Sequence, residues 1–387
     1  MYPANNGDAF LISASGSNVL IDGGFAKTFD DHISKDLLDL SHRGERLDLI
    51  IASHIDADHI SGLIRLFSLN GASSSPRFAS IGEIWHNSLR SLTSKSYAEM
   101  SPSDRDILNA IRQRGHRHPA TELGTDAVEV SARQGSSLAS LIHKSGYKWN
   151  LGDGTRSITY GATLPLPNGT VHIIGPRQER LEGLLKQWKR HLLQIGYSGP
   201  VRADDVIDDA FELMCEHAPD ATSLIATPLS AGGYKQLHEV YEPDTSITNG
   251  SSIAAIIELD GVRILMLSDA WAEDMVDALR TLQSQSHSMM FDMIKVSHHG
   301  SSRNTSPKLL ELIDAPIYMV SSNGAGHDHP DFEVLAAIVD RAAGFSRSIY
   351  LNYSTAASKR LREHQSQSNT PFTVHENATD WITIGRT

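Results

Sequence analysis

The stretch ASHIDADHISG, residues 52–62, places four side chains of metal-ligand type within six positions. It directly follows LDLIIA (47–52), an apolar run that predicts a buried strand. Imidazoles and carboxylates crowded at the end of a buried strand are costly to desolvate unless a positive ion lies among them. The stretch therefore predicts a metal site; the alternative is a surface loop in which an aspartate caps the following helix. The four side chains are His54, Asp56, Asp58 and His59.

Three further stretches place histidine or aspartate directly after a strand pattern. SIAAIIELDGVRILMLSDA (252–270) predicts two strands joined by an Asp-Gly turn. In DMIKVSHHGSS (292–302) a strand ends on two adjacent histidines, and PIYMVSSNGAGHDHPDF (316–332) repeats a strand followed by a polar loop. Because strand ends in an α/β fold meet at one edge, these side chains are expected to gather there. They are Asp269, His298, His299, His327 and His329.

Composition limits the classes of protein to which the chain can belong. Its 387 residues, 40% of them hydrophobic, suffice for a large core, and its formal net charge of −12 gives no global attraction for nucleic acid. The single cysteine, Cys215, excludes an intrachain disulfide and a cysteine-based zinc site; we expect it to be a small buried residue. No apolar run of membrane-spanning length and no signal-peptide pattern is seen, which predicts a cytoplasmic protein.

The regular patterns lie toward the two ends of the chain. GDAFLISA (7–14) and SNVLIDGG (17–24) predict two strands joined by a Ser-Gly turn. From about 87 to 246 the pattern loosens, with helix-like segments at 96–114 and 178–194. We interpret this middle part as insertions around a few core strands.

HIDADH, with the Ile-Ser-Gly that follows it, resembles the first metal motif of the metallo-β-lactamase superfamily, H-x-H-x-D-H, and the other blocks follow in the expected order. Four features are most similar to the metallo-β-lactamase domain of the ComEC competence proteins. They are the aspartate in second place, LMLSDA, KVSHHGSS and a G-H-x-x-P-type histidine. The resemblance covers about 7–85 and 250–340. It implies a single domain over 1–387 with a layered α/β fold, the αββα sandwich, with helical insertions at about 90–245 and an extension at about 345–387.

The resemblance also implies a binuclear site between the two sheets, with two divalent ions, zinc or manganese. His54 and Asp56 would hold one metal ion, Asp58 and His59 the other, and Asp269 would bridge them. Replacing the usual second histidine by Asp56 adds an oxygen ligand, which moves the preference from zinc toward manganese without excluding either.

One of His298 and His299 would complete the second metal site. Because successive residues on a strand point to opposite faces, we expect His299 to be the ligand and His298 a proton-transfer group, with the reverse assignment left open. His329 is a second candidate for protonating the leaving oxygen. Asp58, as a ligand, would be required for the reaction.

The mid-chain histidine of the superfamily has no obvious counterpart. His86 and His172 are candidates, although a lone histidine on a strand is more often a core or surface residue. Asp22, in LIDGG, resembles the aspartate that orients a ligand histidine in this family, and its alternative is a turn-forming residue.

These features predict a metal-dependent hydrolase, because two metal ions can position a hydroxide and neutralise the oxyanion that forms. The resemblance favours a phosphodiesterase or nuclease acting on nucleic acid or on a small phosphodiester. One alternative substrate is a small ester, lactone or phosphorylcholine-type diester. The other alternative is a non-catalytic partner subunit stabilised by its metals. The acidic composition speaks for a small substrate and against long duplex DNA.

Overall fold

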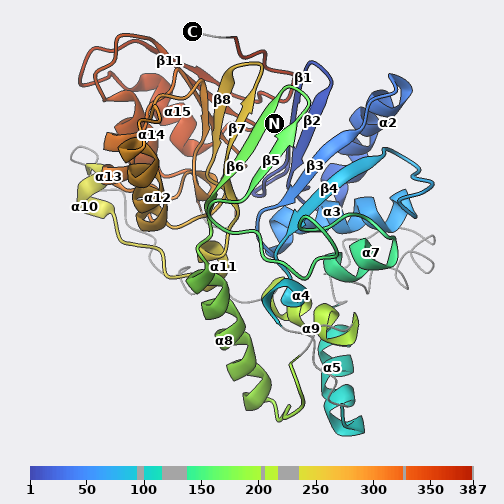
Figure 1. The fold of residues 1–387 in the computed structure, drawn as a ribbon. Coiled ribbons are helices and arrows are strands. Elements are labelled where there is room, and N and C mark those ends of the chain that lie inside the picture. The colour runs from blue at the N-terminus through green and yellow to red at the C-terminus, as the bar shows by residue number, and fades with distance from the viewer. Residues whose placement is uncertain (94–99, 116–136, 202–204, 217–234, 326–327, 386–387) are drawn as a thin grey trace. The chain divides into compact units, whose positions relative to one another are not determined.

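The computed structural model describes residues 1–93, 100–115, 137–201, 205–216, 235–325 and 328–385 (Figure 1). Internal contacts divide the chain into two compact units. The first comprises Met1–Ser17, Thr159–Arg177 and Asp220–Thr387, and the second comprises Asn18–Ile158 and Gln178–Pro219. Whether the whole chain forms one metallo-β-lactamase-like domain with insertions stays a prediction.

The first unit contains an eight-stranded mixed sheet with the strand order β12-β11-β10-β9-β8-β7-β6-β5. Its strands β8 to β12 run parallel to their neighbours, and β5 to β8 pair antiparallel. The predicted Asp-Gly turn joins β7 to β8, with left-handed φ angles of 50° at Asp260 and 78° at Gly261. The strands are β5 (Thr163–Leu166), β6 (Gly169–Gly175), β7 (Ala254–Leu259), β8 (Val262–Met266), β9 (Met293–Lys295), β10 (Ile317–Val320), β11 (Arg347–Leu351) and β12 (Phe372–His375). The first unit also includes β1 (Phe10–Ala14).

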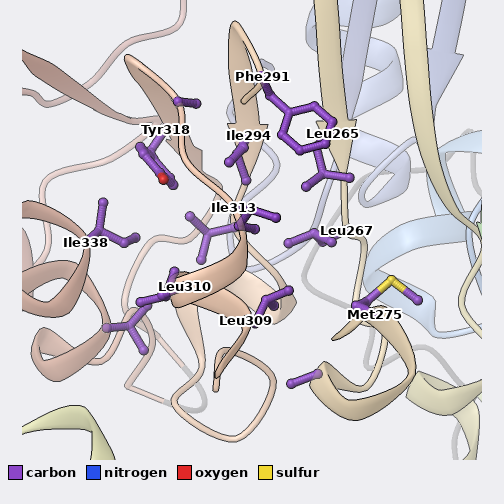
Figure 2. Packing of buried hydrophobic residues seen from close by; sticks show 14 of the residues in the cluster. Leu265, Leu267, Met275, Phe291, Ile294, Leu309, Leu310, Ile313, Tyr318 and Ile338 are labelled. Atoms are coloured by element: carbon purple, nitrogen blue, oxygen red, sulfur yellow. The ribbon is translucent and has the colours of Figure 1, made fainter. Parts of the chain in front are cut away.

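A single apolar row crosses this sheet and packs against helices. The helices contribute buried side chains such as Met275, Leu309 and Ile338, and Figure 2 shows them directed toward residues of the strands. Side chains in register on neighbouring strands share one face of a sheet, so the row forms a continuous apolar surface. Its members are Ile256, Leu265, Ile294, Tyr318 and Ile349.

In the sequence, the helices of the first unit lie between β6 and β12. The helix α12 (Ala272–Ser284) has an acidic first turn, which complements the positive end of the helix dipole. The others are α10 (Leu237–Val240), α11 (Ile247–Gly250), the 3-10 turn η2 (His298–Gly300), α13 (Pro307–Leu312), α14 (Phe332–Val339) and α15 (Ala356–Glu363).

The second unit is built on parallel strands β2 (Ser17–Ile21), β3 (Leu47–Ala52) and β4 (Ile81–His86). β3 and the helix α8 (Gln178–Gln194) have the predicted bounds. The residues ISGLIRLFSL (60–69), which have the apolar spacing of an amphipathic helix, lie in α3 (Ala57–Asn70). The remaining helices are α1 (Ala26–Thr28), the π-helix η1 (Phe29–Ile33), α2 (Ser34–His42), α4 (Leu89–Leu92), α5 (Pro102–Gly115), α7 (Leu138–Lys144) and α9 (Asp205–Glu216).

The α/β fold class predicted from the sequence is confirmed. The chain forms two sheets, with helices between the strands in sequence, and this secondary structure is consistent with a metallo-β-lactamase α/β sandwich. In the described part of the chain, no helix has the length and apolarity that a membrane crossing requires.

A charged network fixes β10 and β11 at their amino ends. Arg347, whose side chain is fully buried, donates to both carboxylate oxygens of Asp314, and Arg341 and Tyr318 donate to the same group. Burial alone would raise the pKa of Asp314, but the hydrogen bond from Arg347 and the charge of Arg341 lower it below its ordinary value of 3.8. The carboxylate is therefore ionised at neutral pH and pairs with two cations.

We expect Asp314→Asn to reduce the free energy of unfolding by about 2–3 kcal/mol at pH 7, because a charged hydrogen-bond acceptor is lost beside a buried arginine. The folded-state pKa of Asp314 is lowered, so its stabilisation is present above the unfolded-state pKa and is lost as the pH falls through the folded-state pKa. The difference between wild type and variant should therefore narrow below about pH 4. Urea unfolding at several pH values measures it, with the exposed Glu311→Gln as control. A pH-independent difference would contradict this assignment.

Candidate metal centre

In the second unit, three candidate residues lie at the carboxyl ends of adjacent parallel strands. Asp22 follows β2, His54 follows β3, and His86 is the last residue of β4. Since parallel strands present their carboxyl ends at the same edge, these three residues lie at one edge of the sheet within this unit.

The Asp22 carboxylate organises the start of this cluster. One oxygen accepts a hydrogen bond from the Ser53 backbone (2.7 Å), and the other lies 2.7 Å from Ser53 Oγ and 2.8 Å from His59 Nδ1. Both Asp22 and His59 are fully buried. A carboxylate can only accept, so His59 Nδ1 carries the proton and Nε2 carries the lone pair when the ring is neutral. The predicted supporting role of Asp22 fits this geometry.

Two glycines allow this close approach. A Cβ atom on Gly62 would lie 2.0 Å from the carbonyl oxygen of Gly23, so neither position tolerates a side chain without moving α3. The Gly23 amide donates to the His59 carbonyl (2.8 Å), which ties the end of β2 to the first turn of α3. The glycine of the Ile-Ser-Gly triplet therefore keeps Asp22 and His59 within hydrogen-bonding distance.

His54 completes a tight group with its neighbours. Its Nδ1 lies 3.1 Å from Ser53 Oγ, its Nε2 lies 3.2 Å from an Asp56 carboxylate oxygen, and its ring centroid is 4.1 Å from that of His59. Asp56 occupies the N-cap position of α3, yet within this described helix its side chain makes no cap hydrogen bond. The simple capping alternative therefore does not account for Asp56. Asp58 lies in the first turn of α3 and is half-buried.

In the first unit, the same arrangement recurs on β8, β9 and β10. Asp269 follows β8, His298 and His299 follow β9, and the loop with His329 follows β10. These strands are parallel neighbours, so the prediction that these side chains share one edge is confirmed in this unit. His327, named with them from the sequence, lies outside the described residues.

His298 and His299 both direct Nε2 toward Asp269. Their Nε2 atoms lie 3.7 and 3.6 Å from Asp269 Oδ2. His299 Nδ1 donates to the Ser321 carbonyl (2.9 Å), and His298 Nδ1 donates to Asn304 Oδ1 (2.8 Å). In both neutral rings the lone pair is therefore on Nε2, the state suited to metal binding or to proton transfer.

The argument from strand alternation for these two histidines is wrong. β9 ends at Lys295, and the histidines stand in the turn η2 with left-handed φ angles of 45° at His298 and 55° at His299. A turn of this kind does not send neighbouring side chains to opposite faces. The His298 side chain is the more exposed, 14% against 6%, which suits proton exchange with solvent, but the assignment of ligand and acid stays a prediction.

His329 stands beside these histidines. Its ring centroid is 5.4 Å from that of His298, and its Nδ1 lies 3.3 Å from an Asp331 carboxylate oxygen. Burial lowers the pKa of His329, although Asp331 acts in the opposite direction. The ring is therefore mostly neutral near pH 7, when it can accept a proton more readily than donate one.

The other candidates have structural partners. His86 is buried, and its Nε2 lies 2.7 Å from a Glu212 carboxylate oxygen. His172 lies in the middle of β6, paired with Thr163 and Ile256 rather than at a strand end. Both positions fit the alternative of a core or sheet residue. Burial raises the pKa of the Cys215 thiol well above its usual range, as expected for a residue without a nucleophilic role.

Sequence reasoning missed two charged residues of the first unit. Asp8 is buried, with one carboxylate oxygen 3.3 Å from His299 Nδ1, and it contacts the buried Lys295. The available signal was a charged residue within an otherwise apolar strand pattern, in GDAFLI for Asp8 and in DMIKV for Lys295.

Both units thus carry buried histidines and carboxylates of a kind that could hold a metal ion. The donor set of imidazole nitrogens and carboxylate oxygens fits zinc or manganese. A second feature supports the fit: His59 Nδ1 bonds to the Asp22 carboxylate and His299 Nδ1 to the Ser321 carbonyl, as is typical for metal-binding histidines. The identity and number of the ions stay predictions.

Comparisons with known proteins agree with this chemistry. Residues 2–75 match the family model of the metallo-beta-lactamase superfamily. Among curated proteins no relative matches the chain. A solved structure that resembles the chain, a metallo-beta-lactamase of Cronobacter sakazakii (Enterobacter sakazakii) with a HARLDQ motif, is 10% identical, with a TM-score of 0.28. The match covers 74% of this chain and 65% of that protein, and a likeness this low supports no inference.

The family match spans His54 to His59, the first predicted metal motif, and thereby supports a metal-dependent hydrolase in general. It does not reach Asp269 or the two adjacent histidines. The ComEC-type relationship stays a prediction.

Asp22→Asn should weaken the metal affinity of the protein about 10–100-fold, because the amide no longer holds the His59 ring with a full negative charge. Competition with a fluorescent chelator measures the affinity for Zn²⁺ and Mn²⁺. Asp48→Asn is the matched control, since Asp48 is also a buried carboxylate at β3 but accepts hydrogen bonds from Asn18 and Arg46 and not from a histidine in the described part of the chain. Equal affinities of wild type and Asp22→Asn would show that Asp22 has no role in metal binding.

Proposed function

We propose that this chain is a metal-dependent phosphodiesterase, acting on nucleic acid or on a small phosphodiester. Its metal ligands are His54, Asp56, Asp58, His59, Asp269 and His299. One observation supports this proposal most: His59 Nδ1 bonds to the Asp22 carboxylate, His299 Nδ1 bonds to the Ser321 carbonyl, and His299 Nε2 lies 3.6 Å from Asp269 Oδ2. A neutral imidazole held in this tautomer is a ligand prepared before the metal arrives.

The bound ions would supply a nucleophile at neutral pH, by lowering the pKa of a water molecule, and would neutralise charge on the reacting phosphoryl group. The residues of the chain supply the rest. Asp22 and Ser53 orient His59, and the Ser321 carbonyl orients His299. His298, held by Asn304, is placed to transfer a proton to the leaving oxygen.

The net charge of −12 favours the small-substrate form of this proposal. Duplex DNA requires several cationic contacts to phosphates, and a strongly acidic protein repels it at long range. A small ester, a lactone or a phosphorylcholine-type diester is therefore the second candidate. The third candidate is a non-catalytic partner subunit. It is less favoured, because a metal ion that only stabilises the fold does not need histidines oriented before it binds.

A substrate panel tests the proposed function. Metal-loaded protein is expected to hydrolyse bis-p-nitrophenyl phosphate and at least one of single-stranded DNA, duplex DNA and RNA, and to leave p-nitrophenyl acetate and a lactone unchanged. Asp58→Ala and His59→Ala should lose more than about tenfold in kcat, a barrier increase of at least ~1.4 kcal/mol. The exposed His42→Ala should behave as wild type. Turnover of the ester or lactone alone would favour the second candidate, and no turnover with full metal occupancy would favour the third.

His298→Ala separates a proton-transfer group from a metal ligand. If His298 protonates the leaving oxygen, the variant should keep its metal and lose about 10²–10⁴-fold in kcat toward an alkyl phosphodiester. The loss should be much smaller for a p-nitrophenyl diester, whose leaving group needs no protonation. His299→Ala should lose metal and activity on both substrates. Metal loss in His298→Ala with retention in His299→Ala would invert the two roles.

A further inference from the structure

Lys295 is a buried cation on the large sheet, between apolar side chains of the two neighbouring strands. It is the last residue of β9, its exposed fraction is 0%, and its register neighbours on β8 and β10 are the buried Met266 and Met319. An ammonium group in such surroundings is costly unless carboxylates and carbonyls surround it. The groups that contact the Lys295 ammonium therefore indicate its role.

Those contacts are two carboxylates that are far apart in the sequence. Lys295 Nζ forms a close ion pair with Asp8, lies 3.6 Å from Asp269 Oδ1 and donates to the Ser268 carbonyl at 3.1 Å. The second oxygen of each carboxylate faces the same imidazole: Asp8 Oδ1 lies 3.3 Å from His299 Nδ1, and Asp269 Oδ2 lies 3.6 Å from His299 Nε2. The four side chains form a closed ring.

The backbone carrying Asp8 is held independently of Lys295. Ser321 Oγ donates to the Gly7 carbonyl (2.6 Å), and Asn352 Nδ2 donates to the Tyr2 carbonyl (3.0 Å). The position of the Asp8 backbone therefore does not require the lysine. What Lys295 contributes is positive charge, which lets two buried carboxylates stand near one another.

We propose that Lys295 is a positioning residue that holds Asp8 and the proposed metal ligand Asp269 in place by supplying part of the positive charge that a divalent ion would supply. This inference rests on the proposed function, in which Asp269 is a metal ligand. Two carboxylates and one ammonium leave an excess of negative charge, so a divalent ion is still attracted. The lysine keeps the first unit's ligands in place when no metal is bound, and it reduces the extra stability that metal binding brings.

Two variants with opposite expected signs test the proposal by thermal unfolding, in chelator and with Mn²⁺ or Zn²⁺ added. Lys295→Met keeps the length of the side chain and removes its charge. In chelator it should lower Tm by about 5 °C or more, because two buried carboxylates lose their cation. Added metal should then raise Tm more than it does in wild type, since the ion replaces the missing charge. Asp8→Asn removes one anion and should give a smaller metal-induced rise than wild type.

Three further arms make the outcome decisive. The double variant Asp8→Asn/Lys295→Met should recover part of the Tm that Lys295→Met loses in chelator, because the uncompensated charge is gone. The exposed Lys308→Met, on α13, should match wild type throughout. Bound metal is quantified by elemental analysis on the same samples. A packing role alone would lower Tm of Lys295→Met equally with and without metal, and that result overturns the proposal.

The design distinguishes this proposal from the proposed function. If wild type binds no metal and its Tm does not respond to it, the metal-dependent function fails, while the comparison in chelator still decides whether Lys295 compensates Asp8. If Lys295→Met does not fold, the comparison of Asp8→Asn with wild type still tests the proposal. Metal-induced rises that are equal in Asp8→Asn and wild type, or larger in Asp8→Asn, overturn the proposal.

Discussion

The structure depends on one electrostatic constraint: carboxylates and imidazoles are buried at the ends of parallel strands and must be neutralised there. Water can no longer solvate Asp22 or Asp269, both of which are almost fully buried. Each carboxylate has a local partner: His59 donates a hydrogen bond to Asp22, and the positive charge of Lys295 lies beside Asp269. Two carboxylates around a single buried lysine retain an excess of negative charge, which is the condition that favours binding of a divalent cation.

The backbone around the candidate ligands is shaped for them. Residues other than glycine adopt left-handed φ angles at several of these positions, a conformation that costs on the order of 1 kcal/mol or more at each and persists only where the surroundings enforce it. Such turns place a side chain at a strand end without continuing the strand. The positions are Asp22 (φ 55°), Ser268 (φ 49°), His298 (φ 45°) and His299 (φ 55°).

How well each feature could be predicted depends on how far apart in the sequence the interacting residues lie. β3 and α8 were predicted with their bounds because apolar periodicity is local. Asp8 and Lys295 were missed because their pairing joins distant parts of the chain, and sequence alone does not show which strand lies beside which. The alternation expected for His298 and His299 failed because a turn, not a strand, carries them.

The central claim is that the histidines and carboxylates at these strand ends bind a divalent metal. Anomalous diffraction at the zinc or manganese edge, from crystals grown with the metal, tests it most directly. The account predicts anomalous peaks about 2.0–2.2 Å from His59 Nε2 and from an Asp269 carboxylate oxygen. Peaks confined to exposed side chains, with none at His59 or Asp269, would contradict it.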